Sequence, residues 1–219
     1  MDVIRLRLGT VNSYLIKTDA GSVLIDTGPR QVRHMLMKKL AGERIRLILL
    51  THGHYDHVAN CGFMMEQTGA QAAVSPADRD FAALNRPGSL KADTPFGHYL
   101  RLLADFNFRL GVYGAAGELL PLLPGNTVRT MGLEFEILPL PGHTAGSVGI
   151  LLNKKQLFVG DAMMDFFHPV RAQLYVDKAA MLQSVERIRT SGVAVIYPGH
   201  GKPFRIENGR FKRGITEEK

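Results

Sequence analysis

The stretch LILLTHGHYDHVANCG, residues 47–62, places three histidines and an aspartate within six residues, directly after an apolar run. The four are His52, His54, Asp56 and His57, and the run before them is typical of a buried strand. In an extended chain residues i and i+2 face the same side, so His52 and His54 are expected to converge on one point. Asp56 and His57 would then turn toward a second point nearby. Imidazole and carboxylate suit zinc, iron and manganese, so a metal site is favoured over a loop of exposed histidines.

Three more residues of the same kind follow predicted strands later in the chain. His143 lies in LPLPGHTAGSVGIL, Asp161 in QLFVGDAMM and His200 in VAVIYPGHGKPF, each beside a glycine that lets the backbone approach closely. One such residue would be weak evidence, since a Gly-His pair in a turn is usually only a turn. Four strand ends that each carry ligand-type groups indicate one shared site.

Length and composition fit a globular protein with a substantial core. The chain has 219 residues, 45% hydrophobic and 21% charged. It has no apolar run of the roughly 20 residues that a membrane-spanning helix needs, and its N-terminus alternates like a strand rather than a signal peptide. The single cysteine, Cys61, cannot form an internal disulfide, which agrees with a reducing compartment. These observations predict a cytoplasmic protein without a membrane partner.

The formal net charge of +7 favours an anionic partner. Charge alone is weak evidence for nucleic-acid binding, so the expected partner is a small-molecule substrate, with an anionic group as one option. Part of the excess charge lies in GKPFRIENGRFKRG, residues 201–214, which we expect to be a solvated end. The oligomeric state stays open, a homodimer included.

Strands and helices alternate along the chain. The pieces VIRLRL, NSYLIKT and SVLIDTG read as three early strands, and a helix is expected between Pro29 and Gly42. Val58 to Thr68 is predicted to form another helix, ended by Gly69. Strands come in hairpins as well as crossovers, which favours two packed sheets with helices outside.

A helical insert is expected at about residues 76–124 of a single domain that spans residues 1–219. Thr94 and Pro95 resemble an N-cap and a first-turn proline, and Phe96, Tyr99, Leu100 and Leu103 follow at near-helical spacing. We expect this insert to border the site, where its apolar face would suit an acyl chain.

The motifs together resemble the metallo-β-lactamase fold superfamily, in particular the hydrolase branch similar to glyoxalase II. The resemblance covers about residues 10–204 and is carried by NSYLI (12–16), IDTG (25–28), THGHYDH (51–57), PGHTAGS (141–147), GDA (160–162) and PGHG (198–201). It implies an α/β fold, a four-layer αββα sandwich of two mixed sheets, with a metal centre at one edge.

The resemblance also implies a ligand set for two divalent metal ions. One ion would be held by His52, His54 and His143, and the other by Asp56, His57 and His200, with Asp161 bridging the two. Zinc is the first choice, and iron and manganese are alternatives. Asp26 in the IDTG motif is not a ligand in the family, and is either a turn residue or a group that orients a ligating imidazole.

The function expected from this centre is metal-dependent hydrolysis. A metal-bound hydroxide would attack a thioester, lactone or related carbonyl ester, and Asp56 would also accept a proton from the attacking water. The alternatives are a phosphodiesterase or nuclease of the same fold, a mononuclear iron enzyme similar to persulfide dioxygenases, and a sensor without activity. His168, Lys202 and Arg205 are further candidates for substrate contact.

Overall fold

Two mixed β-sheets form the centre of the molecule in the computed structural model, which describes residues 2–84, 90–110 and 118–214. The first sheet has six strands in chain order: β1 (Asp2–Leu8), β2 (Val11–Thr18), β3 (Gly21–Ile25), β4 (Ile45–Leu49), β5 (Gln71–Val74) and β6 (Leu120–Pro121). Its first three strands pair antiparallel, and its last four pair parallel.

The second sheet has seven strands in the order β15-β14-β13-β10-β9-β8-β7. Their bounds are β7 (Thr127–Thr130), β8 (Leu133–Pro139), β9 (Val148–Leu152), β10 (Gln156–Gly160), β13 (Val195–Pro198), β14 (Phe204–Glu207) and β15 (Arg210–Arg213). Only β10 and β13 pair parallel among them, so their carboxyl ends lie side by side. A small hairpin of β11 (Met163–Asp165) and β12 (Pro169–Arg171) follows β10.

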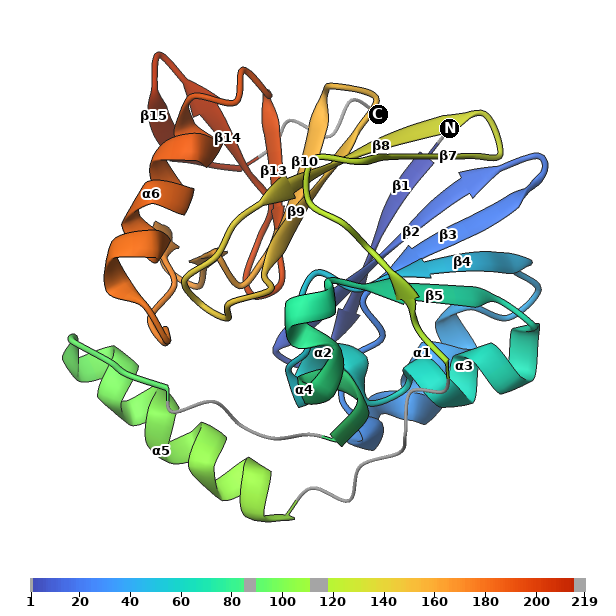
Figure 1. Cartoon of the computed structure of the whole chain (residues 1–219), viewed down its shortest axis with the longest axis horizontal. Helices are drawn as coiled ribbons and strands as arrows, with labels where there is room; N and C mark the ends of the chain where they lie inside the picture. The colour runs from blue at the N-terminus through green and yellow to red at the C-terminus, as the bar shows by residue number, and fades with distance from the viewer. Residues whose placement is uncertain (1, 85–89, 111–117, 215–219) are drawn as a thin grey trace.

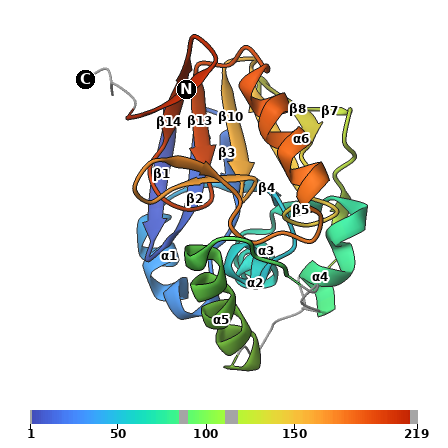
Figure 2. The ribbon, with the colours of Figure 1, turned by 90° about the vertical axis from the view of Figure 1, so that its left-hand side faces the viewer.

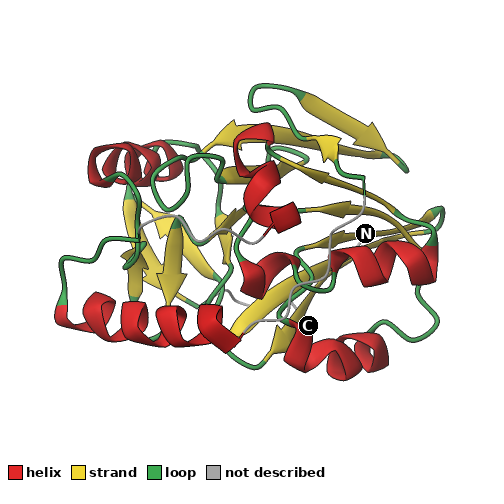
Figure 3. Ribbon diagram, turned by 60° about the horizontal axis from the view of Figure 1, so that its bottom comes forward, coloured by secondary structure: helices red, strands yellow, loops and turns green. Residues whose placement is uncertain are grey.

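Helices cover the outer face of each sheet, as Figures 1 and 3 show. The helix α1 (Arg33–Lys39), entered through a 3-10 turn at Arg30–Val32, packs on the first sheet together with α3 (Cys61–Thr68), and α6 (Lys178–Arg189) packs on the second. The remaining helical elements are α2 (Tyr55–Val58), a 3-10 turn at Pro76–Asp78, α4 (Arg79–Leu84) and α5 (Pro95–Leu110). The predicted αββα arrangement is confirmed.

Three apolar layers hold these elements together. Between the sheets, Ile16 and Val23 meet Phe135, Ile150 and Phe158. The neighbouring side chains of the same strands point outward, because successive residues of a strand face opposite sides. Outward-facing residues of the first sheet pack against α1 and α3, and those of the second sheet pack against α6. Both faces of the inner strands are therefore buried, which is why the strands read as nearly continuous apolar runs.

Two sequence predictions differ from the structure. The basic tail has exposed charges, as predicted, but it is part of the fold, because β14 and β15 form a hairpin that extends the second sheet and buries Phe204 completely. Its turn is Asn208-Gly209, both with positive φ, a hairpin signal that the charge of the segment obscured. The helix predicted from Val58 starts only at Cys61, because Asn60 lies between α2 and α3 and donates to the carbonyls of residues 27–29.

Backbone contacts tie the two sheets together at one edge. The backbone amide of Asn12 in β2 donates to the Gly199 carbonyl at 2.8 Å, and the Tyr14 hydroxyl donates to the Pro198 carbonyl at 2.6 Å. The Val148 amide of β9 donates to the Thr51 carbonyl at 2.9 Å. These contacts fix the loops that follow β4, β8 and β13 at the same edge. Within the described residues, no helix is long and apolar enough to cross a membrane.

We predict that Phe158→Ala lowers the free energy of unfolding by about 3–5 kcal/mol, because it opens a cavity between the sheets. Phe158 is fully buried and packs edge-on against Tyr14. The matched control is Phe167→Ala, since Phe167 is 76% exposed and its loss should change stability by less than about 0.5 kcal/mol. Urea unfolding of both variants measures the difference, and equal stabilities would contradict this account of the core.

Candidate metal centre

The seven predicted ligand-type residues lie together at the edge where the sheets are tied. His52 and His54 come from the loop after β4, and Asp56 and His57 from the short helix α2 that follows. The other three follow β8, β10 and β13 and are His143, Asp161 and His200. Three overlapping groups have ligand atoms within 4.8 Å of one another: His52, His54 and His143; His52, His57 and Asp161; and Asp56, His57 and His200.

The first of these groups is a cluster of three buried imidazoles. The Nδ1 atom of His54 lies 2.8 Å from Nε2 of His143, and the ring centroids of His52 and His143 are 4.9 Å apart. His52, His54 and His143 are 6% exposed or less. Ring nitrogens gathered this closely in a buried site can share a single cation.

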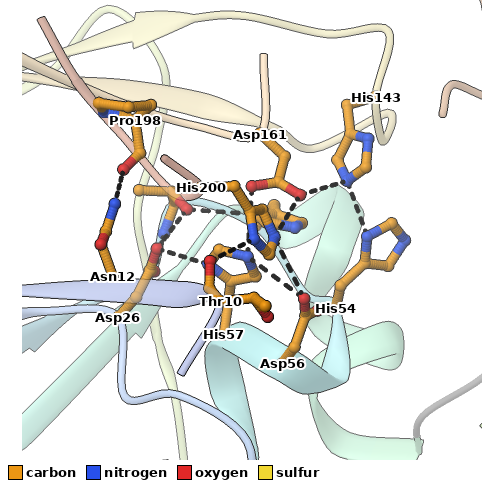
Figure 4. Close-up of polar contacts among 12 residues, drawn as sticks. Thr10, Asn12, Asp26, His54, Asp56, His57, His143, Asp161, Pro198 and His200 are labelled. Atoms are coloured by element: carbon orange, nitrogen blue, oxygen red, sulfur yellow. Dashed lines mark hydrogen bonds and ion pairs between the residues drawn. The ribbon is translucent and has the colours of Figure 1, made fainter. Parts of the chain in front are cut away.

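Asp161 lies between this cluster and the second group, as Figure 4 shows. Its Oδ2 is 3.6 Å from Nε2 of His143 and 3.3 Å from Nε2 of His200, and its Oδ1 is 3.3 Å from Nε2 of His57. Asp56 completes the second group, with Oδ2 3.3 Å from Nε2 of His200 and 3.8 Å from Nε2 of His57. The Asp161 carboxylate thus contacts both groups.

Hydrogen bonds outside the centre orient three of the imidazoles. Nδ1 of His143 donates to the Leu174 carbonyl at 2.7 Å, and Nδ1 of His200 donates to the Thr10 carbonyl at 2.9 Å. Nδ1 of His57 lies 2.9 Å from Oδ2 of Asp26. Because each Nδ1 is occupied by an acceptor, Nε2 of each ring faces the centre and presents its lone pair there when the ring is neutral.

Asp26 contacts both the His57 imidazole and the loop that carries His52. It is therefore a group that orients the site and not only a turn residue, the two options that the sequence left open. Its carboxylate also accepts hydrogen bonds from the backbone amide and the hydroxyl of Thr51, both at 2.8 Å. Asp26 has φ 55°, a left-handed conformation that only short polar side chains and glycine adopt readily. This conformation at the end of β3 aims the buried carboxylate at the loop that carries His52.

Glycine is required where the last loop passes the centre. A Cβ atom on Gly199 would lie 2.4 Å from Oδ1 of Asp161 and 2.6 Å from Cε1 of His57. Any larger residue would displace one of these side chains. The PGHG motif is therefore explained by the close approach of backbone to the site.

The donor atoms present fit a bound cation. Nε2 of His52 is buried and has no hydrogen-bond partner in the described part of the structure, and buried Nε2 of His57 and Oδ1 of Asp161 face each other at 3.3 Å. A buried polar atom without a hydrogen-bond partner costs free energy, and such atoms are rare in native proteins. The unpaired nitrogen of His52 and its place beside the His57–Asp161 pair are accounted for if a metal ion binds among these three groups.

Burial and mutual proximity perturb the pKa values of these groups. Burial lowers the pKa of His52 well below its ordinary value and that of His54 to about 3. For His57 and His200 burial acts in the same direction, but nearby carboxylates, Asp161 above all, outweigh it and raise both pKa values, that of His200 to about 10. Burial would raise the pKa of Asp161, yet His200 and His57 hold it well below its ordinary value.

Asp78 is a residue that the sequence did not single out. It is fully buried, and its carboxylate accepts hydrogen bonds from the Gly53 amide at 2.9 Å, the Thr144 hydroxyl at 2.6 Å and the Gly146 amide at 2.8 Å. Gly53 lies between His52 and His54, and Thr144 follows His143. Asp78 therefore ties together the two loops that supply the three-histidine group, which only the fold could reveal.

A cavity of about 220 Å³ opens onto the centre. His54, Asp56, His143, Asp161 and His200 line one part of it, and Leu90, Leu100, Leu103, Ala104, Met164, Phe166 and Leu174 are among its other lining residues. A second cavity shares Thr10, Asp56 and Ala104 with it and extends toward Gln31 and Tyr55. Asp56 thus has open space on two sides.

The other candidate residues lie elsewhere. His168 and Phe167 line a separate groove on the far side of Phe166, and Tyr175 is buried. Arg205 forms an ion pair with Glu207 in β14, and neither it nor Lys202 is among the described lining residues of the cavity. Cys61, the first residue of α3, is buried in the core, where desolvation raises the pKa of its thiol to about 12.

The family model of the metallo-beta-lactamase superfamily matches residues 6–200 of the chain. The chain therefore belongs to this superfamily. A probable metallo-hydrolase of Methanocaldococcus jannaschii is 28% identical over 87% of this chain and 87% of its own length. An atrochrysone carboxyl ACP thioesterase of Aspergillus fumigatus is 25% identical over 95% of this chain and 55% of its own length. The crystal structure of a metallo-beta-lactamase family protein from Thermus thermophilus has a TM-score of 0.69 and 26% identity, over 92% of this chain and 73% of that one.

Several curated relatives are longer than the matched region. The chain spans 65% of the length of relatives from Drosophila melanogaster and Homo sapiens, as well as the 55% of the thioesterase. The shared region is therefore only part of each of those proteins.

Zinc binding is expected to release protons at pH 7.5. Without metal, the raised pKa values of His57 and His200 keep both imidazoles protonated at this pH, and a metal ion binds only the neutral ring. The apparent affinity should therefore rise with pH up to about 10, the pKa of His200, and fall as the pH is lowered. Titration of the metal-free protein with zinc in weak buffer containing a pH indicator measures the release. An affinity that does not change between pH 6 and 9 would contradict this assignment.

Asp78→Asn is expected to lower metal affinity by about 10–100-fold, the usual effect of removing a group that orients ligands. The amide would place an NH₂ group against at least one backbone N–H donor, at a cost of about 1–3 kcal/mol in stability. Asp80→Asn is the matched control, because Asp80 is exposed two residues further along. Zinc titration and urea unfolding measure both effects, and an Asp78→Asn protein that matches the control would show that this carboxylate has no positioning role.

Proposed function

We propose that this chain is a dinuclear metal-dependent hydrolase that cleaves carbonyl esters, thioesters and lactones included. The observation that carries the proposal is the set of three overlapping ligand groups, joined through His52 and His57, at the edge of the two sheets. A single ion would leave part of this donor set unused. Two ions would engage all of it.

The ligand assignment follows from the contacts within the centre. In this proposal His52, His54 and His143 would hold one ion and Asp56, His57 and His200 the other, and Asp161, which lies near both groups, would complete the ligand set. The donor set of imidazoles and carboxylates, without thiolate, suits zinc first, and iron or manganese next. The same seven positions are those expected from the branch similar to glyoxalase II.

Metal ions bound there would supply a nucleophile from water at neutral pH and polarise a substrate carbonyl. The residues of the chain direct that chemistry. Asp56 lines the cavity and its side chain is 38% exposed, so its carboxylate can accept the proton of the attacking water. Leu174 and Thr10 hold His143 and His200 through backbone carbonyls, so both rings keep one orientation. The apolar lining limits access of bulk water to the carbonyl.

The choice of a carbonyl ester rests on two kinds of support. The relatives include a probable metallo-hydrolase and an ACP thioesterase. The name of the second protein states that it acts on a thioester, which is a carbonyl ester of a thiol. The described lining of the cavity contains no lysine or arginine that would stabilise a phosphodiester. The net charge of +7 therefore does not concentrate at this site.

The test is metal analysis combined with a substrate panel. Purified protein is expected to hold about two zinc ions per chain and to cleave p-nitrophenyl esters or aliphatic thioesters. His54→Ala should remove one metal equivalent and lower kcat/KM by at least about 100-fold, because loss of a ligand exceeds loss of a group that only orients one. His34→Ala is the matched control, since His34 is exposed on α1.

Other outcomes point to the rival activities. Cleavage of bis-p-nitrophenyl phosphate without esterase activity would replace this proposal with a phosphodiesterase. One iron per chain with oxygen uptake would replace it with an iron oxygenase. A fully metallated protein that turns over nothing in the panel would favour a sensor.

A further inference from the structure

The apolar side chains described for the helix α5, residues 95–104, lie outside every core layer. Leu102 is 67% exposed, Tyr99 57% and Leu103 42%, and none of the described residues of α5 belongs to the clusters between sheets and helices. Figures 1 and 2 show α5 outside the two sheets, at the end of the molecule where α2 lies. Exposed apolar surface of this extent usually serves binding, since it does nothing for the core.

One strip of α5 forms a wall of the metal-centre cavity. Leu100, Leu103 and Ala104 line this cavity together with the ligand-type residues. The spacing of three and four residues places these side chains on one side of the helix. Leu102 is not among the described lining residues, so adjacent leucines of the same helix differ in whether they reach the cavity.

The start of α5 is fixed to the segment that also orients His143. The Lys91 amide donates to the Tyr175 carbonyl at 2.8 Å, and the Thr94 hydroxyl donates to Oε1 of Gln173 at 2.7 Å. Between these two anchors lies Leu174, whose carbonyl accepts from Nδ1 of His143. The cavity wall and one ligand-type imidazole therefore depend on the same short stretch, 171–175.

Ion pairs strengthen this anchor. The Asp93 carboxylate lies 2.7 Å from the Arg171 guanidinium and 2.6 Å from the Lys178 ammonium. The ring of Phe96 meets that of Phe166 edge-on at 5.9 Å, and Phe166 in turn lines the cavity. These contacts hold the first turns of α5 at a defined distance from the centre.

The part of the cavity beside α5 disfavours an anionic acyl group. Its described lining contains no lysine or arginine, and the two carboxylates, Asp56 and Asp161, belong to the proposed metal centre. The residues from α5 and from the opposite side, Met164 and Leu174, are apolar. A carboxylate at the far end of an acyl chain would lose its hydration against these apolar residues, because the metal ions of the proposed centre would lie at the other part of the cavity, where the carbonyl binds.

We propose that this cavity binds the acyl group of the substrate and selects an uncharged, apolar chain, with Leu103 of α5 as a specificity-determining residue. The proposal rests on the function proposed above. In the reaction the acyl C–S or C–O bond breaks, water supplies a hydroxyl to the acyl carbon, and its remaining proton goes to the leaving thiol or alcohol. The apolar chain lies along α5 while the carbonyl faces Asp56 and His200.

Paired lysine variants on adjacent positions test the proposal. Leu103→Lys places a cation in the cavity, whereas Leu102→Lys makes the same change in charge on the exposed side of α5. The zinc-loaded proteins are assayed with p-nitrophenyl acetate, octanoate and glutarate. Wild-type protein is expected to prefer octanoyl over glutaryl, and Leu103→Lys should shift the ratio of their kcat/KM values toward glutaryl by at least about tenfold. Leu102→Lys should keep the wild-type ratio.

A binding measurement separates this proposal from the proposed function. Octanamide, which the enzyme is not expected to cleave readily, is titrated calorimetrically into each protein, with succinamate as the anionic comparison. Binding of octanamide to wild type and Leu102→Lys, weakened in Leu103→Lys, supports the acyl cavity even if no ester is cleaved. Ester cleavage with equal rates for octanoyl and glutaryl, or a ratio that Leu103→Lys leaves unchanged, overturns the acyl cavity and leaves the hydrolase in place.

Discussion

Two sheets pack face to face through side chains such as Phe135, Ile150 and Phe158, and that packing brings every ligand-type residue of the centre to its place. The loops that carry these residues belong to four strands in two different sheets. Each loop alone would expose its polar groups to water. Because the sheets are held together at one edge by contacts such as Asn12 with Gly199 and Tyr14 with Pro198, the loops meet in a confined space. The hydrophobic layer thus provides the free energy that gathers polar groups against their own preference for water.

The polar groups gathered at this edge are organised in two shells. The inner atoms, such as Nε2 of His52 and Oδ1 of Asp161, face one another, and Nε2 of His52 has no hydrogen-bond partner among the described residues. The outer atoms are satisfied by carboxylates and backbone carbonyls, among them Asp26 and the carbonyl of Leu174. An arrangement that fixes the outer atoms and turns the inner nitrogens and carboxylates toward one another is suited to holding a cation. Buried carboxylates such as Asp26 and Asp78 connect this outer shell to the sheets.

The helix α5 has a different relation to the fold. The sandwich is complete without it, since its described residues take no part in the three apolar layers. Its start is fixed by polar contacts and by ion pairs of Asp93, rather than by burial of its own apolar face. An element attached in this way can change its lining residues at little cost to the core, which suits a wall that determines specificity.

The sequence by itself determined the strands, most of the helices and the positions of the seven ligand-type residues, because these depend on local periodicity and on residue chemistry. It also contained the Asn208-Gly209 turn, although the basic composition of that segment favoured the wrong interpretation. Only the tertiary structure decided that Asp78 joins the Gly53 and Thr144 loops and that Leu103, but not Leu102, reaches the cavity among the described residues. In the sequence alone, nothing distinguishes Asp78 or Leu103 from other aspartates and leucines. Their roles arise from contacts between segments far apart in the chain, which no local pattern records.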